Sequence, residues 1–323
     1  MSVNTLVKDG LLTNLEAETK ILKINAKIGE VHYNPGLARD DKGNLWISIR
    51  SCVITPDRWE GYQHPNHYQN FLHVGMLGEK DLTISRLKEI KPLEEYTGFQ
   101  WGIEDIRLFW RKDGMHGIGV IIPIENGQYK IRQAEILIDY KAGTYKLLKD
   151  HGRPFGHAEK NWAPSENAND NFDFIYSPTQ IIKDGVVTGA DNELFIHNGT
   201  PLIPFEDGYI SLGHAVVAVM GERTYAQIAM KWSANGELLE HTQFFHFNVG
   251  WRETLKETIE FASGLVWSEG KAGSELLVGL GVKDELVGVA KLPIAQLKWF
   301  EYSDTTWYAW CWEGQPNRVE VIG

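Results

Sequence analysis

WGIEDIRLFW, residues Trp101 to Trp110, encodes a strand that begins with two carboxylates and a guanidinium. Glu104, Asp105 and Arg107 lie between a glycine and an alternating apolar run. Burying such charges costs several kcal/mol unless they are paired. A structural ion pair between two strands and a functional site are equally good explanations of this stretch. Similar polar clusters recur at other strand edges, and this recurrence favours a site.

Length and composition limit the function classes. The chain has 323 residues, 43% hydrophobic and 23% charged, enough for one large all-β domain or two average ones. Its net charge of −11 and the lack of a long basic run argue against a nucleic-acid partner. The 12 Trp, 12 Tyr and 13 Phe suit a core together with a sugar site, because the apolar face of a sugar ring packs on an indole.

Cysteine usage and the N-terminus indicate the compartment. Cys52 and Cys311 lie far apart in sequence and form neither a disulfide framework nor a zinc pattern. The opening MSVNTLVKDG has no signal-peptide pattern. No apolar stretch approaches the roughly 20 residues that a membrane helix needs. We therefore expect a cytoplasmic protein with no membrane partner.

Alternating apolar residues between turn signals predict strands along almost the whole chain. Examples are LWISIR, Leu45 to Arg50, and FLHVGML, Phe71 to Leu77; Glu125-Asn126-Gly127 signals a hairpin. Only short helical turns are expected, one capped by Asn14 and one in LPIAQLKW, Leu292 to Trp299. This pattern predicts a sandwich, a barrel or a propeller.

A recurring strand-rich block distinguishes these folds. LWISIRS, MHGIGVIIP, FDFIYSPTQ, YISLGHAV and LLVGLGVKD each end in polar residues. Their starts lie roughly 35 to 70 residues apart, and propeller modules run about 40 to 50 residues. Five blocks predict a five-bladed β-propeller formed by one domain, residues 1–323. In such a ring the polar ends of the inner strands face one shared pocket.

The candidates for that pocket have ordinary explanations when each is taken alone. Asn34 suits a turn, Arg50 and Lys160 suit surface charges, His214 suits a satisfied core histidine, and Asp284 suits a hairpin. Their joint occurrence with the carboxylates favours a common site. The full set is Asn34, Arg50, Glu104, Asp105, Arg107, Glu159, Lys160, Asn161, Trp162, His214 and Asp284.

The order of these motifs resembles a known enzyme family. NPG, GIEDIRLF, AEKNWAP, DGYISLGHAV and LLVGLGVKD, over roughly residues 30–295, resemble the five-bladed propeller glycosidases, most closely glycoside hydrolase family 130. EDIR is similar to the family's E-D-P-R, with Ile106 in place of Pro. GYISLGHAV is similar to G-W-L-x-x-x-H-G-V, with Tyr209 for Trp and Ala215 for Gly.

Two departures from the family concern phosphate. Tyr176-Ser177-Pro178 stands where the phosphorylases carry an Arg, and Asn198-Gly199-Thr200-Pro201 stands near their Lys. Charge-assisted hydrogen bonds are the strong ones, so the loss of two cations weakens a phosphate site. The resemblance therefore implies an inverting glycoside hydrolase of β-mannoside type. Inorganic phosphate remains an alternative co-substrate, which would make the protein a phosphorylase.

The resemblance also implies residue roles. Asp105 is the candidate acid, acting directly or through a sugar hydroxyl, and Glu159 the candidate base, oriented by Lys160. A carboxyl separation of about 6.5–9.5 Å would leave room for water and give inversion. The other candidates would bind the oligosaccharide, with Trp162, Trp101 and Tyr209 stacking on rings and the loop Trp59–Tyr68 forming a further subsite. No metal or cofactor is required.

Two other function classes remain open. One is a non-catalytic sugar-binding propeller, which would tolerate the loss of Asp105. The other is a glycosyltransferase-like enzyme, because SELLVGLGVKDELVGVAKL also resembles a segment of propeller proteins linked to glycosyltransferases. A propeller fold alone does not choose between them.

Overall fold

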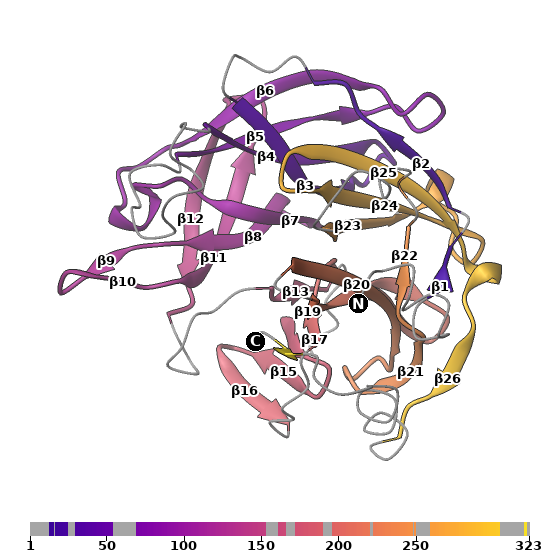
Figure 1. The fold of residues 1–323 in the computed structure, drawn as a ribbon. Helices are drawn as coiled ribbons and strands as arrows, with labels where there is room; N and C mark the ends of the chain where they lie inside the picture. Colours follow the sequence, from indigo (N-terminus) through magenta and orange to yellow (C-terminus); the bar gives the residue numbers. More distant parts are fainter. Residues whose placement is uncertain are drawn as a thin grey trace.

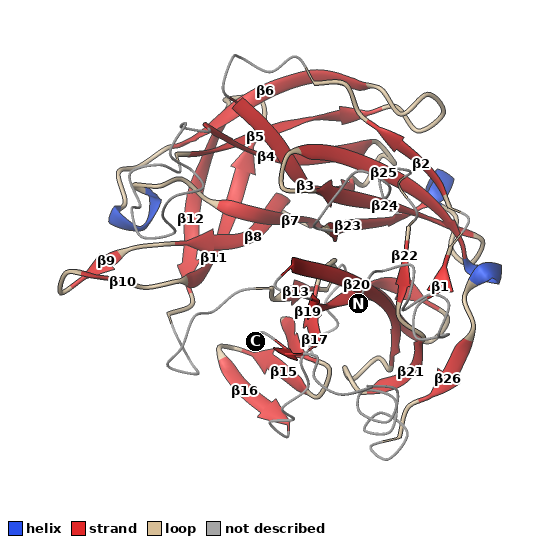
Figure 2. Cartoon of the chain, viewed as in Figure 1, coloured by secondary structure: helices blue, strands red, loops and turns tan. Residues whose placement is uncertain are grey.

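Strands make up nearly all the regular structure of the protein. The computed structural model describes residues 13–15, 17–24, 30–53, 69–152, 161–165, 172–189, 196–219, 222–247, 249, 259–303 and 320–321. Helical structure in these residues is limited to three 3-10 turns, η2 (Thr97–Phe99), η3 (Ser268–Gly270) and η4 (Ile294–Gln296), drawn in blue in Figure 2. The predicted all-β class is confirmed. None of the helical segments described here could reach across a membrane.

The first two four-stranded units share one sheet. The first unit contains β3 (Glu30–Arg39), β4 (Leu45–Val53), β5 (Asn70–Leu77) and β6 (Ile84–Pro92), paired antiparallel in chain order. The second unit contains β7 (Glu104–Arg111), β8 (Gly114–Ile121), β11 (Arg132–Asp139) and β12 (Thr144–Asp150). Their outer strands β6 and β12 pair in parallel. Between β8 and β11, the predicted hairpin forms from β9 (Ile124–Glu125) and β10 (Gln128–Tyr129).

The third and fourth units follow in the chain. The third contains β13 (Ala163–Pro164), β14 (Phe174–Ser177), β15 (Gln180–Lys183) and β16 (Val186–Gly189). The fourth is built on β17 (Ile196–Asn198), β18 (Ile203–Phe205), β19 (Gly208–Val219), β20 (Glu222–Trp232) and β21 (Leu238–Thr242). Its sheet also takes in four short strands: β1 (Thr13–Asn14), β22 (Phe245–His246), β26 (Trp299–Glu301) and β27 (Glu320–Val321).

The fifth unit combines three late strands with one early strand. It contains β23 (Glu260–Trp267), β24 (Glu275–Val282) and β25 (Leu286–Pro293), and β2 (Glu18–Ile21) completes it on the outer edge. The units follow one another around a common centre in chain order, as the colour sequence in Figure 1 shows. Each block recognised in the sequence is a strand with partners on both sides, namely β4, β8, β14, β19 and β24. The architecture is propeller-like.

Hydrophobic clusters fill the space between neighbouring units. Leu72 of the first unit and Leu108 of the second share one cluster, and Phe109 of the second and Phe174 of the third share another. Similar clusters join the third to the fourth and the fourth to the fifth unit. A last cluster, which includes Ile47 and Val289, joins the fifth unit back to the first. Because each fully buried aliphatic side chain contributes roughly 1.5–3 kcal/mol, these clusters hold the ring together.

One local prediction is wrong. Asn14 does not cap a helical turn, because Thr13–Asn14 pairs with β22 in parallel and Leu15 is buried in the core. LPIAQLKW does contain a short helical segment, the 3-10 turn η4, after which Trp299 begins β26 and pairs with β21. The aromatic loop Trp59–Tyr68 lies outside the described residues.

Candidate functional site

Three polar residues share an uncommon backbone conformation at the inner strands of consecutive units. Asn34, Asp105 and Asn161 have φ values of 49°, 51° and 65°. Asn34 and Asp105 lie in register shifts of β3 and β7, and Asn161 lies two residues before β13. Positive φ is uncommon for residues other than glycine, and β-bulges re-aim side chains next to active sites. The positive φ angles therefore give these three side chains directions that regular strand pairing would not allow.

Asp105 is held by two donors from the first unit. The Asn34 Nδ2 and the Arg50 Nη1 donate to its Oδ1 over 2.8 and 2.9 Å. Burial alone would raise the pKa of Asp105, but the charges of Arg50 and Arg107 and the two hydrogen bonds lower it below the usual range. The side chain is 19% exposed, and none of the described hydrogen bonds reaches Oδ2. Asp105 is thus an ionised carboxylate with one oxygen left for a ligand.

Glu104 and Asn70 complete the surroundings of Arg50. Arg50 Nη2 lies 2.8 Å from Glu104 Oε1, and Arg50 Nε donates to Asn70 Oδ1 over 2.8 Å. Asn70 Nδ2 donates in turn to Glu104 Oε1 over 3.0 Å. Burial lowers the pKa of Arg50, but Glu104, then Tyr33 and Asp105, raise it well above the usual value. Arg50 is therefore always charged, and two carboxylates balance that charge.

Asn70 was not predicted from the sequence. It occupies the first position of β5, where an asparagine carries no distinctive signal, and it is 3% exposed. Both its main-chain N–H and its side-chain amide donate to the carbonyl of Trp101, over 3.0 Å each. Its importance comes from a contact between two units, which no local sequence pattern encodes.

Arg107 lies beneath the site, out of contact with solvent. Arg107 is 0% exposed. Its Nε donates to Gly199 O over 2.9 Å, its Nη1 donates to Asp105 O over 2.8 Å, and its Nη2 donates to Asn161 Oδ1 over 2.8 Å. Burial lowers its pKa to about 10, against the opposing effect of Asp105. A direct hydrogen bond to a sugar does not fit this position. Arg107 is instead a positioning residue that fixes Asp105 and Asn161.

Two other predicted ligands are core residues. His214 on β19 is 2% exposed, stacked on Tyr225 with centroids 5.3 Å apart and edge-on to Phe261 at 4.9 Å. Trp162 is 1% exposed and packs against Phe174. A sugar could not reach either ring without movement of these neighbours, so the predicted direct contacts are corrected to packing roles.

The remaining predicted residues are placed as follows. Tyr209 is 4% exposed and packs edge-on to Phe172, which corrects the prediction that it stacks on a sugar. Trp101 is half-buried beside Asn70 and remains available as a stacking candidate. Asp284 lies in the tight turn between β24 and β25 with φ 54°, as its hairpin interpretation predicts.

Glu159 and Lys160 lie outside the described residues. Within the described residues, no group of three His, Cys, Asp or Glu could hold a metal ion.

Comparisons with known proteins relate this geometry to other folds. No family model matches the chain, and no curated protein is found as a relative. Among solved structures, the β-1,2-mannobiose phosphorylase from Listeria innocua, in complex with β-1,2-mannobiose, is similar with a TM-score of 0.56 and 14% identity, covering 85% of this chain and 93% of that one. The mannose phosphorylase MPT-4 from Leishmania mexicana, in complex with a phosphate ion, is similar with a TM-score of 0.56 and 11% identity, covering 93% and 95%.

A third similar structure is described as belonging to the GH130 family of mannoside phosphorylases, which contains glycoside hydrolases that target β-1,2 mannosidic linkages in Candida mannan. It has a TM-score of 0.54 and 12% identity, covering 88% of this chain and 91% of that one. At such identities the likeness concerns the fold. The resemblance inferred from the sequence motifs is confirmed at this level: the chain has the fold of the mannoside phosphorylases and glycoside hydrolases of family 130.

Proposed function

We propose that this protein is a carbohydrate-active enzyme that hydrolyses a glycosidic bond at the centre of a single-domain, five-bladed propeller formed by residues 1–323. The observation that carries the proposal is the Asp105 carboxylate, which lies in a register shift of β7 and accepts hydrogen bonds from Asn34 and Arg50 on one oxygen. The neighbouring Glu104 and Asn161 are further proposed ligands of sugar hydroxyls, and the buried Asn70 holds Glu104 in place.

Asp105 is the proposed proton donor to the leaving oxygen, directly or through a sugar hydroxyl. Its pKa is lowered in the free protein, so it must gain a proton when the substrate binds. Burial is the largest influence on this pKa and acts upward. A sugar that covers the exposed part of Asp105 would add to burial and favour the protonated form. Glu159 remains the proposed base that activates water, and inversion remains the proposed stereochemical outcome.

Hydrolysis is favoured over phosphorolysis by the state of the two arginines. Arg50 is neutralised by Glu104 and Asp105, and Arg107 is buried against carbonyl and amide oxygens. Neither presents a free charge to a phosphate ion. The two segments that depart from the family pattern also contact each other, because Asn198 Nδ2 donates to Tyr176 O over 3.0 Å. A hydrogen bond between two neutral groups thus occupies a region where the phosphorylases are expected to carry cations.

The test is turnover of a panel of β-mannosides, and β-1,2-mannobiose first, with and without inorganic phosphate. We expect release of free sugar that does not depend on phosphate, and at least a 100-fold loss in Asp105→Asn, since general acid catalysis contributes about 10²–10⁴. Release of sugar 1-phosphate would show a phosphorylase instead. Saturable binding without turnover would indicate a sugar-binding propeller, and release of a nucleoside diphosphate from a nucleotide sugar would indicate a transferase.

A further inference from the structure

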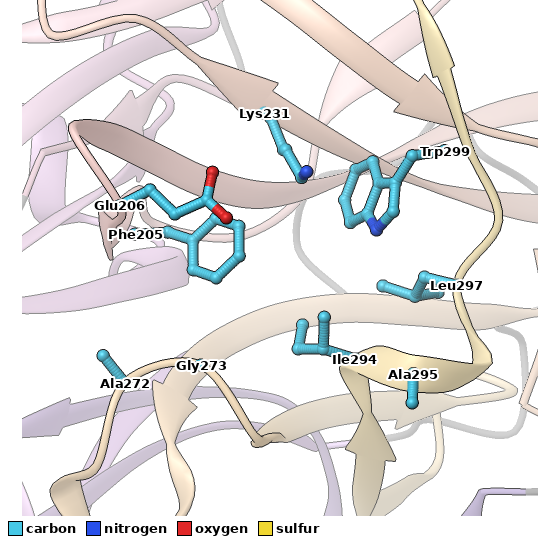
Figure 3. A pocket seen from close by; sticks show the side chains of 9 residues that line it. All are labelled: Phe205, Glu206, Lys231, Ala272, Gly273, Ile294, Ala295, Leu297 and Trp299. Carbon is cyan, nitrogen blue, oxygen red and sulfur yellow. The ribbon is translucent and has the colours of Figure 1, made fainter.

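A cavity of ≈ 580 Å³ lies between the fourth and fifth units (Figure 3). Its lining comes from the β18–β19 turn, β20, the β23–β24 connection, η4 and the start of β26. This volume lies within the range of about 300–1,000 Å³ typical of small-molecule sites. The residues that line it are Phe205, Glu206, Lys231, Ala272, Gly273, Ile294, Ala295, Leu297 and Trp299.

This cavity is separate from the Asp105 site. Phe261, near the start of β23, lies under the Arg107 guanidinium, 5.4 Å from ring centroid to Cζ. Ala272 and Gly273 follow the opposite end of the same strand, beyond Trp267. A strand rises about 3.3 Å per residue, so Phe261 and Trp267 are separated by roughly 20 Å. A ligand in the cavity would not touch Asp105.

Two aromatic rings of the cavity wall lie near one ammonium group. Lys231 Nζ lies 4.5 Å from the ring centroid of Trp299 and 5.4 Å from that of Phe205, and it forms an ion pair with Glu240. Trp299 is fixed by strand pairing with Thr242, and Phe205 packs against Trp267 with centroids 5.5 Å apart. The walls are therefore preformed, which lowers the entropic cost of binding.

The chemistry of the lining selects the ligand. Figure 3 shows the Glu206 carboxylate and the Lys231 ammonium directed into the space between Phe205 and Trp299, with Ile294 and Leu297 on the other side. An anion is disfavoured, because Glu240 already neutralises Lys231, Glu206 adds a negative charge, and the chain carries −11. A wholly apolar ligand would desolvate the Glu206 carboxylate without giving it a partner.

We propose that this cavity is a second, non-catalytic binding site for a pyranose sugar. The apolar face of the ring would lie against Trp299 and the aliphatic wall, while its hydroxyls would donate to Glu206 and accept from Lys231. The inference rests on the proposed function only in the choice of probe, β-1,2-mannobiose. It does not require that the protein be an enzyme.

The test follows the indole N–H signal of Trp299 by NMR, identified by its absence in Trp299→Phe. We expect a saturable shift with a Kd of about 1 mM on addition of β-1,2-mannobiose, in the wild type and in Asp105→Asn alike. Glu206→Gln and Ala295→Phe, both at exposed positions on the rim, should weaken this response at least 10-fold. Tyr129→Ala, an exposed aromatic in the second unit, is the matched control and should change nothing.

Three outcomes would overturn the proposal. The first is a Trp299 signal that does not move up to about 20 mM sugar, a range that covers weak millimolar binding. The second is an equal shift with glycerol, which has no ring to stack. The third is a shift that depends on protein concentration without sugar, which would show an interface between copies. Absence of turnover together with a saturable Trp299 shift would reject the proposed hydrolase and leave this site standing.

Discussion

The guanidinium of Arg107 donates to the side-chain oxygen of Asn161 over 2.8 Å, and so joins the first strand of the second unit to the segment that enters the third. The same side chain reaches Gly199 O, next to the fourth unit. One buried cation thus spans three units directly under the candidate carboxylate. The position of Asp105 depends on this connection, because Arg107 also holds the Asp105 carbonyl.

Arg107→Met should destabilise the protein strongly. The substitution keeps the length of the side chain but leaves three buried oxygens without donors, and breaking such a network costs about 3–5 kcal/mol. The measurement is the midpoint of equilibrium unfolding in urea. Arg86→Met, at an exposed position, is the control and should change stability by less than about 0.5 kcal/mol. Equal shifts in the two variants would contradict the role assigned to Arg107.

Asn34→Asp should move the alkaline limb of the pH–rate profile to higher pH, because that limb reports the ionisation of the group that must carry the proton. It replaces a donor 2.8 Å from Asp105 with a second carboxylate, and two close carboxylates cannot both ionise easily. We expect a rise of about one pH unit or more in the apparent pKa of the pair, read from kcat/KM and from the ¹³C carboxyl signal of the free protein. Asn34→Ala, which removes only a hydrogen bond, should cause a smaller rise. If this limb did not move in Asn34→Asp, the ionisation of Asp105 would not control the observed rate.

His151 should make the protein less stable as the pH falls below neutral. The ring packs against Trp162 and Phe174, with centroid distances of 5.0 and 5.2 Å, and burial, then Lys149, lowers its pKa to about 4. Since the unfolded state binds the proton from about pH 6.5 downward, stability is full above that pH and declines toward pH 4, by about 3 kcal/mol. His151→Phe should lack this component. A stability difference between wild type and variant that stays constant from pH 7 to 4 would refute it.

Gly36→Ala should disturb both stability and the site. A Cβ at this position would lie 2.4 Å from Ile106 O and 2.5 Å from Ser48 Oγ, so the β7 bulge beside Asp105 must shift. We expect a loss of about 1–3 kcal/mol, typical of overpacking, together with lower activity. At Gly288 the nearest atom to an added Cβ is 3.4 Å away, an ordinary contact, so Gly288→Ala provides the control for thermal unfolding. Similar melting temperatures for both variants would count against this tight approach.

Much of the architecture could be predicted from the sequence because its signals are local. Alternation in LWISIRS or LLVGLGVKD, followed by turn residues, encodes a strand and its end within ten residues. The five blocks are accordingly all strands with partners on both sides. The proximity of Asn34, Arg50 and Asp105 was expected from the recurrence of polar groups at strand ends, and the hydrogen bonds between them bear this out.

The burial of individual side chains could not be predicted in this way. Arg107 and Gly199 are 92 residues apart, and their contact depends on how separate units face one another. The same holds for Trp162, which the sequence offers equally as a stacking surface or as a core residue. Its hydrophobic cluster includes Phe109 and Ile118 of the second unit. Asn70 shows the converse case, since the approach of the second unit gives this ordinary residue its contacts with Trp101 and Glu104.

The pairing of β2 with β25 has a consequence for biosynthesis. Ile21 and Gly288 are register partners although 267 positions separate them (288 − 21). At about 5–20 residues per second, the ribosome adds the second partner roughly 13–50 s after the first. During that interval the early segment has no sheet to join. Nascent chains of this protein should therefore engage chaperones until translation is nearly complete, and a stall before β25 should yield an aggregation-prone fragment.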